Sequence, residues 1–186
     1  MKLSDEYQYY ILCEDAQMQT FLVSFLKCHR INSHKIRPIP IPAGQGCGEA
    51  HVRRRFPLEV KFMRQNNYLR IALIVCVDAD RLTVDSRKEK LFDELGLEFE
   101  KKDVAKEPIV IWIPKREIET WIHFFRGETV DENMSFIHDG RPCSCKEEAA
   151  KMYALCTRDS INDITCLPSL IAAKAEYERV CALQQK

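Results

Sequence analysis

The stretch IALIVCVDADR, residues 71–81, runs seven apolar residues directly into two aspartates separated by one alanine. A strand that is apolar on both faces is typical of the centre of a parallel sheet, where helices cover both sides. Functional groups in such sheets gather at the carboxyl ends of the strands. The stretch therefore predicts an α/β fold and makes Asp78 and Asp80 candidate functional residues.

Segments on either side of this stretch alternate between strand-like and helical patterns, as an α/β fold requires. Further strands are predicted over residues 6–13 and 108–113, with an edge strand over residues 34–41, where two prolines remove ladder donors. Helices are predicted after Asp15, over residues 49–66, from a Ser86-x-x-Glu89 capping box to Gly96, and over residues 117–125, 146–158 and 168–184. Pro57 is expected to kink the second of these helices or to start a new segment. The two C-terminal helices could form a lid or a docking surface.

Length and composition fit one globular domain, because 186 residues with 46% apolar and 30% charged content can bury a sizeable core. The longest apolar run is too short to span a membrane, and the N-terminus lacks the apolar centre of a signal peptide. We therefore expect a cytosolic protein. Its nine cysteines are odd in number, and several lie in apolar patterns, so reduced thiols are expected.

Charge is balanced overall but unevenly distributed. Residues 1–70 carry 11 Lys and Arg against 6 Asp and Glu, and residues 71–186 carry 17 against 22. One half could meet phosphates while the other supplies carboxylates, although solvated surface charge explains such asymmetry equally well.

Carboxylates follow three of the predicted strands. They are Glu14 and Asp15, then Asp78 and Asp80, then Glu117 and Glu119. Residues two apart on an extended segment point the same way, so Asp78 and Asp80 are expected to aim at one point. Clustered oxygen ligands suit Mg²⁺ or Mn²⁺. The alternative for the D-x-D alone is a turn followed by a helix cap.

The order of these acids, with the Arg116-Glu117-Ile118-Glu119-x-Trp121 element, resembles the Toprim domain, in particular the small nucleases related to the OLD (overcoming lysogenisation defect) family of prokaryotic anti-phage systems. The resemblance covers residues 6–126. It implies a Toprim-like, Rossmann-like, mainly parallel sheet flanked by helices over residues 1–127, with a helical extension over residues 128–186 packed on or beside it.

The resemblance also implies a function. Glu14 would be the metal-associated acid/base, Asp78 and Asp80 the metal-binding pair, and Glu119 the acid that completes a catalytic Mg²⁺ or Mn²⁺ site. The chain would then be a metal-dependent nuclease subunit that cuts DNA or RNA in anti-phage defence. A separate ATPase subunit would be its partner, and the chain could work as a homo-oligomer or within a hetero-complex.

The alternative is a Toprim-like module that engages a partner protein or nucleic acid without cleavage. Asp15 and Met18 favour it, because relatives carry glycine and a further acid at these positions. Asp78, Asp80 and Glu119 favour the nuclease.

Basic side chains could form a positive rim that holds nucleic-acid phosphates. The candidates are Arg53, Arg54, Arg55, Lys61, Arg64, Lys115 and Arg116. For each of them, a solvated surface charge is the competing interpretation.

Two other patterns in the sequence concern possible ligand sites. Residues 44–48 (GQGCG) could cradle a phosphate, but without a following G-K-S/T they are no Walker A loop, so ATP hydrolysis is not expected. A zinc site could form from His138, Cys143, Cys145, Cys156 and Cys166. Paired C-x-x-C knuckles are absent from the sequence and Cys156 falls in an apolar helical pattern, which argues against zinc.

Overall fold

The structure is a computed structural model, and it describes residues 1–42, 48–96, 104–136, 143–158 and 166–185. Most of the 44–48 loop and His138 lie outside these ranges. Among the described residues, no helix is both long enough and apolar enough to cross a lipid bilayer.

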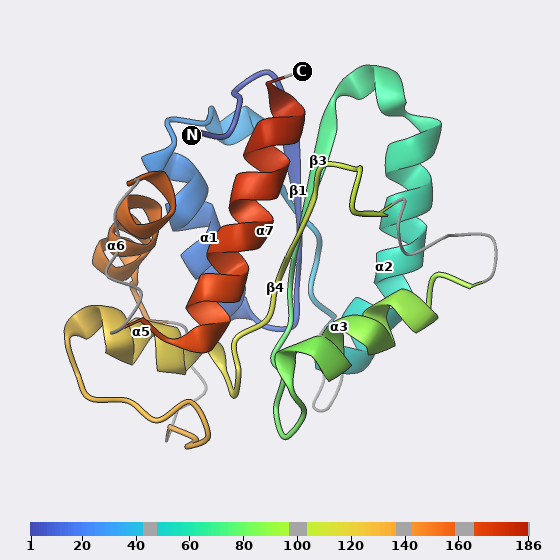
Figure 1. Cartoon of the computed structure of the whole chain (residues 1–186). Helices are drawn as coiled ribbons and strands as arrows, with labels where there is room; N and C mark the ends of the chain where they lie inside the picture. The colour runs from blue at the N-terminus through green and yellow to red at the C-terminus, as the bar shows by residue number, and fades with distance from the viewer. Residues whose placement is uncertain (43–47, 97–103, 137–142, 159–165, 186) are drawn as a thin grey trace.

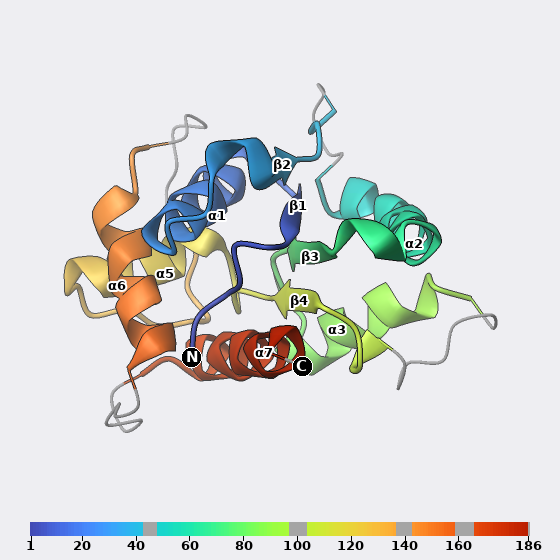
Figure 2. The ribbon, with the colours of Figure 1, turned by 90° about the horizontal axis from the view of Figure 1, so that it is seen from above.

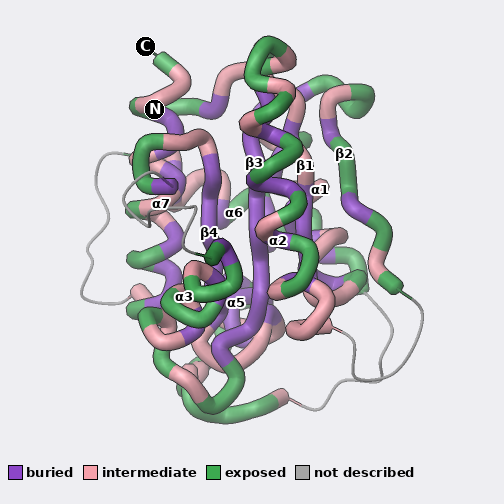
Figure 3. The backbone as a smooth tube through the Cα atoms, turned by 90° about the vertical axis from the view of Figure 1, so that its right-hand side faces the viewer, coloured by how far each residue is buried: buried purple, intermediate pink, exposed green. Residues whose placement is uncertain are grey.

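Four parallel strands form one sheet in the order β2-β1-β3-β4. They are β1 (Gln8–Cys13), β2 (Ile36–Pro38), β3 (Ile71–Cys76) and β4 (Ile109–Trp112). All six residues of β3 are buried between its neighbours (Figure 3). The predictions of a central apolar strand and of a proline-containing edge strand are therefore confirmed.

Helices cover both faces of this sheet and make a three-layer α/β fold, as Figures 1 and 2 show. One face carries α1 (Ala16–Cys28), α5 (Ile118–Arg126), α6 (Lys146–Thr157) and α7 (Pro168–Gln184), and the other carries α2 (Gly48–Gln65) and α3 (Val84–Asp93). Short 3₁₀ turns precede β2 and β3 at Ser33–Lys35 and Asn67–Leu69.

Alternation along the strands divides the core into two apolar clusters. In β3, Ala72, Ile74 and Cys76 face the α1 side, and Leu73 and Val75 face the α2 side. Successive side chains of a strand point to opposite faces, so both sets must be apolar when both faces are covered. This is the physical reason for the uninterrupted run that the sequence contains.

The two C-terminal helices belong to the packed layer on the α1 side. Trp112 at the end of β4 is 1% exposed, and its indole N–H donates to the Ala173 carbonyl of α7 at 2.9 Å. Tyr177 of α7 is fully buried in the same cluster as Phe25 of α1, and α6 packs along α1. The boundary at residue 127 stays a prediction, but the core on this face draws on residues from both sides of it.

Two local predictions need correction. Helix α3 begins at Val84, and its cap is Thr83, whose hydroxyl accepts the Ser86 N–H at 3.0 Å. Ser86 is therefore the donor at this terminus, because the chain enters the helix three residues earlier than the capping box implied. Pro57 lies inside α2, which continues without a new segment to Gln65.

Candidate active site

The predicted acids lie at the carboxyl edge of the sheet. Glu14 directly follows β1, Asp78 follows β3 by two residues, and Glu119 lies in the first turn of α5 after β4. The backbone around Asp78 is fixed, because Val77 N–H donates to the Trp112 carbonyl at 3.2 Å and Ala79 N–H to the Pro114 carbonyl at 2.9 Å. The expected convergence of three strand ends therefore occurs in the fold.

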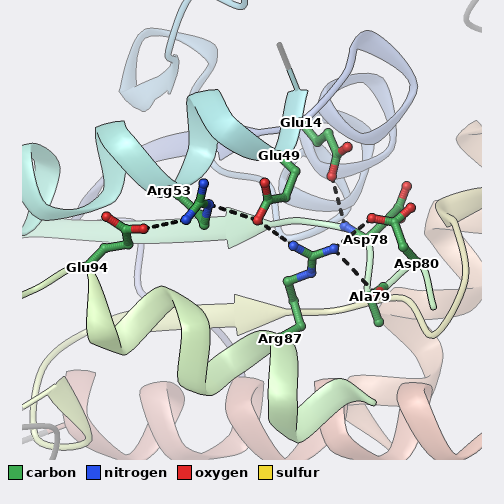
Figure 4. A network of polar contacts seen from close by, with 8 residues as sticks. All are labelled: Glu14, Glu49, Arg53, Asp78, Ala79, Asp80, Arg87 and Glu94. Carbon is green, nitrogen blue, oxygen red and sulfur yellow. Dashed lines mark hydrogen bonds and ion pairs between the residues drawn. The ribbon is translucent and has the colours of Figure 1, made fainter. Parts of the chain in front are cut away.

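Glu14 and Asp78 are in direct contact. Asp78 N–H donates to Glu14 Oε2 at 3.2 Å, a contact that Figure 4 shows from close by. Burial raises the pKa of Glu14 to about 7, the Asp78 N–H bond opposes that rise, and the carboxylates of Asp80 and Asp15 add to it. Glu14 is therefore close to half protonated at neutral pH, which is the range that acid/base chemistry requires.

A glycine permits the position of Glu14. A Cβ atom built on Gly48, the first residue of α2, would lie 2.4 Å from Glu14 Cγ and 2.9 Å from its Oε1. Contacts below about 3 Å displace one partner, so a larger residue at this position would push the Glu14 side chain. In the sequence, Gly48 belongs to the glycine-containing stretch at residues 44–48, and nothing in that pattern indicates a contact with Glu14.

Asp78 is the most strongly perturbed of the acids. The residue is 9% exposed, and its Oδ1 has no hydrogen-bond partner within the part of the chain that the structure describes. Burial raises its pKa well above the usual value, and the charges of Glu14, Asp15, Glu119 and Asp80 raise it further. Four of the other five acids predicted from the sequence, all but Glu117, therefore act on this one buried carboxyl.

Asp80 lies in a different environment from Asp78. The chain turns at Asp80 with a φ of 54°, so the segment is not extended there, and the expectation that both carboxyls aim at one point stays a prediction. The Asp80 side chain is 57% exposed, and its Oδ2 accepts a hydrogen bond from Arg87 Nη2 at 2.7 Å.

Arg87 of α3 connects Asp80 to α2. Its side chain is 6% exposed and also pairs with Glu49 in the first turn of α2, at 2.5 Å. Glu49 in turn pairs with Arg53 at 3.0 Å, and Arg53 with Glu94 at 2.6 Å (Figure 4). Arg87 and Glu49 are not distinguished in the sequence, because each resembles an ordinary helix-surface charge and only the packing of α2 against α3 joins them.

Oxygen ligands of the kind that Mg²⁺ and Mn²⁺ prefer are present at this edge. The unpartnered Asp78 Oδ1 beside Glu14 fits a cation or a shared proton. Across the described ranges, however, no group of three or more His, Cys, Asp or Glu side chains is arranged to hold a metal ion. Asp80 is engaged by Arg87, which is one physical reason, so a third protein ligand requires a change at that ion pair.

Asp15 has a structural role. Its Oδ1 accepts the Met18 N–H at 2.8 Å and caps α1, as the sequence indicated. Met18 is fully buried in the core. Glu117 precedes α5 and accepts the Phe136 N–H.

The predicted basic residues do not form one patch. Arg53, Arg55 and Arg64 are paired with Glu side chains, Arg64 through two hydrogen bonds to Glu107 at 2.6 and 3.1 Å. Lys115 donates to the Leu82 carbonyl at 2.6 Å and Arg116 to Ser135 Oγ at 2.8 Å. Arg54 and Lys61 are exposed on α2.

The alternative zinc ligands are also spread out. Cys145 and Cys156 are buried, Cys143 is exposed and accepts from Arg126 Nη2 at 3.7 Å, and Cys166 is half-buried. The absence of a metal-holding group over the described ranges applies to these thiols as well.

Comparison of the chain with protein-family models, with curated proteins and with solved structures finds no match. The four-stranded parallel sheet between helices establishes a Rossmann-like α/β fold. The resemblance to Toprim nucleases stays a prediction from the residues.

Proposed function

We propose that the carboxyl edge of the sheet is the active site of a metal-dependent nuclease of the Toprim type. The observation that carries the proposal is the hydrogen bond from the Asp78 backbone N–H to the Glu14 carboxylate, which holds together two residues whose carboxyl pKa values are both raised. Two neighbouring carboxyls that are costly to ionise are stabilised by a proton or by a divalent cation.

The chain's own residues would share the work. Asp78 and Glu14 would hold the cation, and Asp80 and Glu119 would complete the site once Asp80 leaves Arg87. A bound Mg²⁺ or Mn²⁺ would polarise a phosphate oxygen and lower the pKa of a water molecule. Glu14, deprotonated beside the cation, would take a proton from the attacking water at a carboxylate oxygen and return it to the leaving oxygen.

A second function competes with this one. The Arg87–Asp80 ion pair and the lack of a three-ligand group among the described residues favour a module that binds nucleic acid or a partner protein without cutting. In that case, Glu14 and Asp78 would share a proton and the edge would be structural.

Cleavage of plasmid DNA and of RNA with Mg²⁺ or Mn²⁺ tests the proposal. Asp78→Asn should abolish cutting, because the cation loses a buried ligand that no neighbour replaces. Asp5→Asn is the matched control, since Asp5 is exposed near the N-terminus and should leave cutting unchanged. Cutting that persists in Asp78→Asn, or cutting that no metal supports, contradicts the proposal.

Thermal unfolding separates the two functions without a substrate. Millimolar Mn²⁺ should raise the melting temperature of the native chain, because only the folded state presents the site, and should leave Asp78→Asn unchanged. Equal shifts in both proteins would favour the module without metal.

The defence role and the separate ATPase subunit rest on the resemblance. Co-expression with the product of a neighbouring ATPase gene, followed by co-purification, tests this part independently. Cleavage of nucleic acid only in the presence of that ATPase would support both the nuclease activity and the ATPase partner.

A further inference from the structure

An open polar cleft of about 550 Å³ lies beside Asp80. Five cations line it: Arg53 of α2, Arg81 of the loop after β3, Arg87 and Lys90 of α3, and Arg116 of the loop after β4. The two carboxylates that also line it are Glu49 and Asp80. The lining therefore has an excess of positive charge next to the acidic edge, although the whole chain has a net charge of zero.

Three of these cations have no carboxylate partner within the part of the chain that the structure describes. Arg53 and Arg87 are paired with Glu49, Glu94 and Asp80. Over the described ranges, by contrast, Arg81, Lys90 and Arg116 make no ion pair. Like charges held around one cleft repel each other, so an anion that enters the cleft relieves this repulsion.

The lining also indicates the kind of anion. Leu82 is the only apolar side chain among the described lining residues, and no aromatic ring is among them on which a base could stack. Recognition of nucleic acid without stacking or base contacts acts on phosphates, and Arg and Lys are the side chains that make such contacts. The position next to Asp80 would put a bound phosphate at the acidic edge.

We propose that this cleft binds backbone phosphates of a nucleic-acid strand through Arg81, Lys90 and Arg116 and so delivers a phosphodiester to the carboxylate edge. The choice of a strand as the occupant rests on the proposed nuclease function. Binding is independent of base sequence. The cleft differs from the rim of basic residues that the sequence predicted. The two sets share only Arg53 and Arg116.

The test measures binding without cleavage. A fluorescein-labelled single-stranded oligonucleotide of about 12 nucleotides is titrated with protein in EDTA, and fluorescence anisotropy gives Kd at several salt concentrations. The variant Arg81→Gln with Lys90→Gln removes two unpaired cations from the cleft. The control Lys27→Gln with Arg158→Gln also removes one arginine and one lysine. Both are exposed on the opposite face, Lys27 on α1 and Arg158 directly after α6.

The cleft variant should bind about tenfold or more weakly at low salt, and its slope of log Kd against log salt should fall by about 1.4, because each single-strand phosphate contact contributes about 0.7. The control should keep the native Kd and slope. Arg81→Lys with Lys90→Arg, which keeps both charges, should restore binding. Equal melting temperatures would show that each variant is folded.

Three outcomes would overturn the inference. They are native binding by the cleft variant, equal weakening in the cleft and control variants, and binding of inorganic pyrophosphate or a nucleoside triphosphate but not of the oligonucleotide. Because EDTA removes divalent metal, failure here is distinct from failure of the metal site. Strand binding by the native chain that is not followed by cleavage with Mg²⁺ or Mn²⁺ would support the cleft and contradict the nuclease.

Discussion

Glu14→Gln should change how the stability of this protein depends on pH. Burial raises the pKa of Glu14 from 4.5 to about 7 in the folded chain. The folded state therefore binds the proton more tightly than the unfolded state does. Stability from this group is fully present below about pH 4.5 and is lost as pH rises through about 7.

The size of the effect follows from the shift. One pKa unit corresponds to about 1.4 kcal/mol, so the shift of Glu14 corresponds to about 3 kcal/mol in total. About 2.5 kcal/mol of this loss falls between about pH 5 and about pH 8. Gln has nearly the shape of Glu and does not titrate, so Glu14→Gln should remove this part of the decline.

Urea unfolding followed by circular dichroism at about pH 5 and about pH 8 measures the decline in each protein. Comparison of the two proteins isolates the contribution of Glu14, which includes its effect on Asp78, because the charge of Glu14 raises the pKa of that carboxyl. Glu147→Gln makes the same substitution at an exposed position on α6 and should keep the native decline.

The same decline in Glu14→Gln as in the native protein would refute the reasoning that burial sets the proton affinity of Glu14. Unfolding in the presence of Mg²⁺ is a second measurement on the same site. A cation binds the deprotonated carboxyls, so it should stabilise the native chain more at about pH 8 than at about pH 5.

Three further predictions concern groups elsewhere in the fold. Burial lowers the pKa of His29 to about 4. The free energy of unfolding should therefore fall by about 2 kcal/mol as the pH falls from about 7 to about 5, and that of His29→Phe should not show this fall. Arg87→Gln should lower the free energy of unfolding by about 2 kcal/mol, because Asp80 loses its partner and Glu49 keeps only Arg53, while Arg54→Gln on the surface of α2 should change it by less than about 0.5 kcal/mol in urea unfolding. Trp112→Phe should cost about 2 kcal/mol in thermal unfolding through the lost bond to Ala173 and the cavity left behind, and an unchanged melting temperature would show that α7 does not depend on that contact.

Local patterns in the sequence determined the strands and most of the helices. The apolar run at residues 71–77 indicates that β3 is buried on both faces, because helices cover both sides of the sheet. Prolines mark β2 as an edge strand, and Asp15 marks the start of α1. The order of strands and acids in the sequence also predicted that the acids after β1, β3 and β4 lie at one edge of the sheet, since parallel strands carry their carboxyl ends to one edge.

Only the tertiary structure decided how those acids are paired and which charges surround them. Arg87 meets Asp80 and Glu49 because α3 packs near α2, and Gly48 lies against Glu14 because α2 begins beside the end of β1. Neither the Arg87–Glu49 contact nor the Gly48–Glu14 contact has a periodic signal, since in each the two residues lie far apart in sequence. The sequence by itself determined what each element buries, because burial follows local alternation, while ion pairs, pKa shifts and the basic cleft depend on distances that only the folded chain sets.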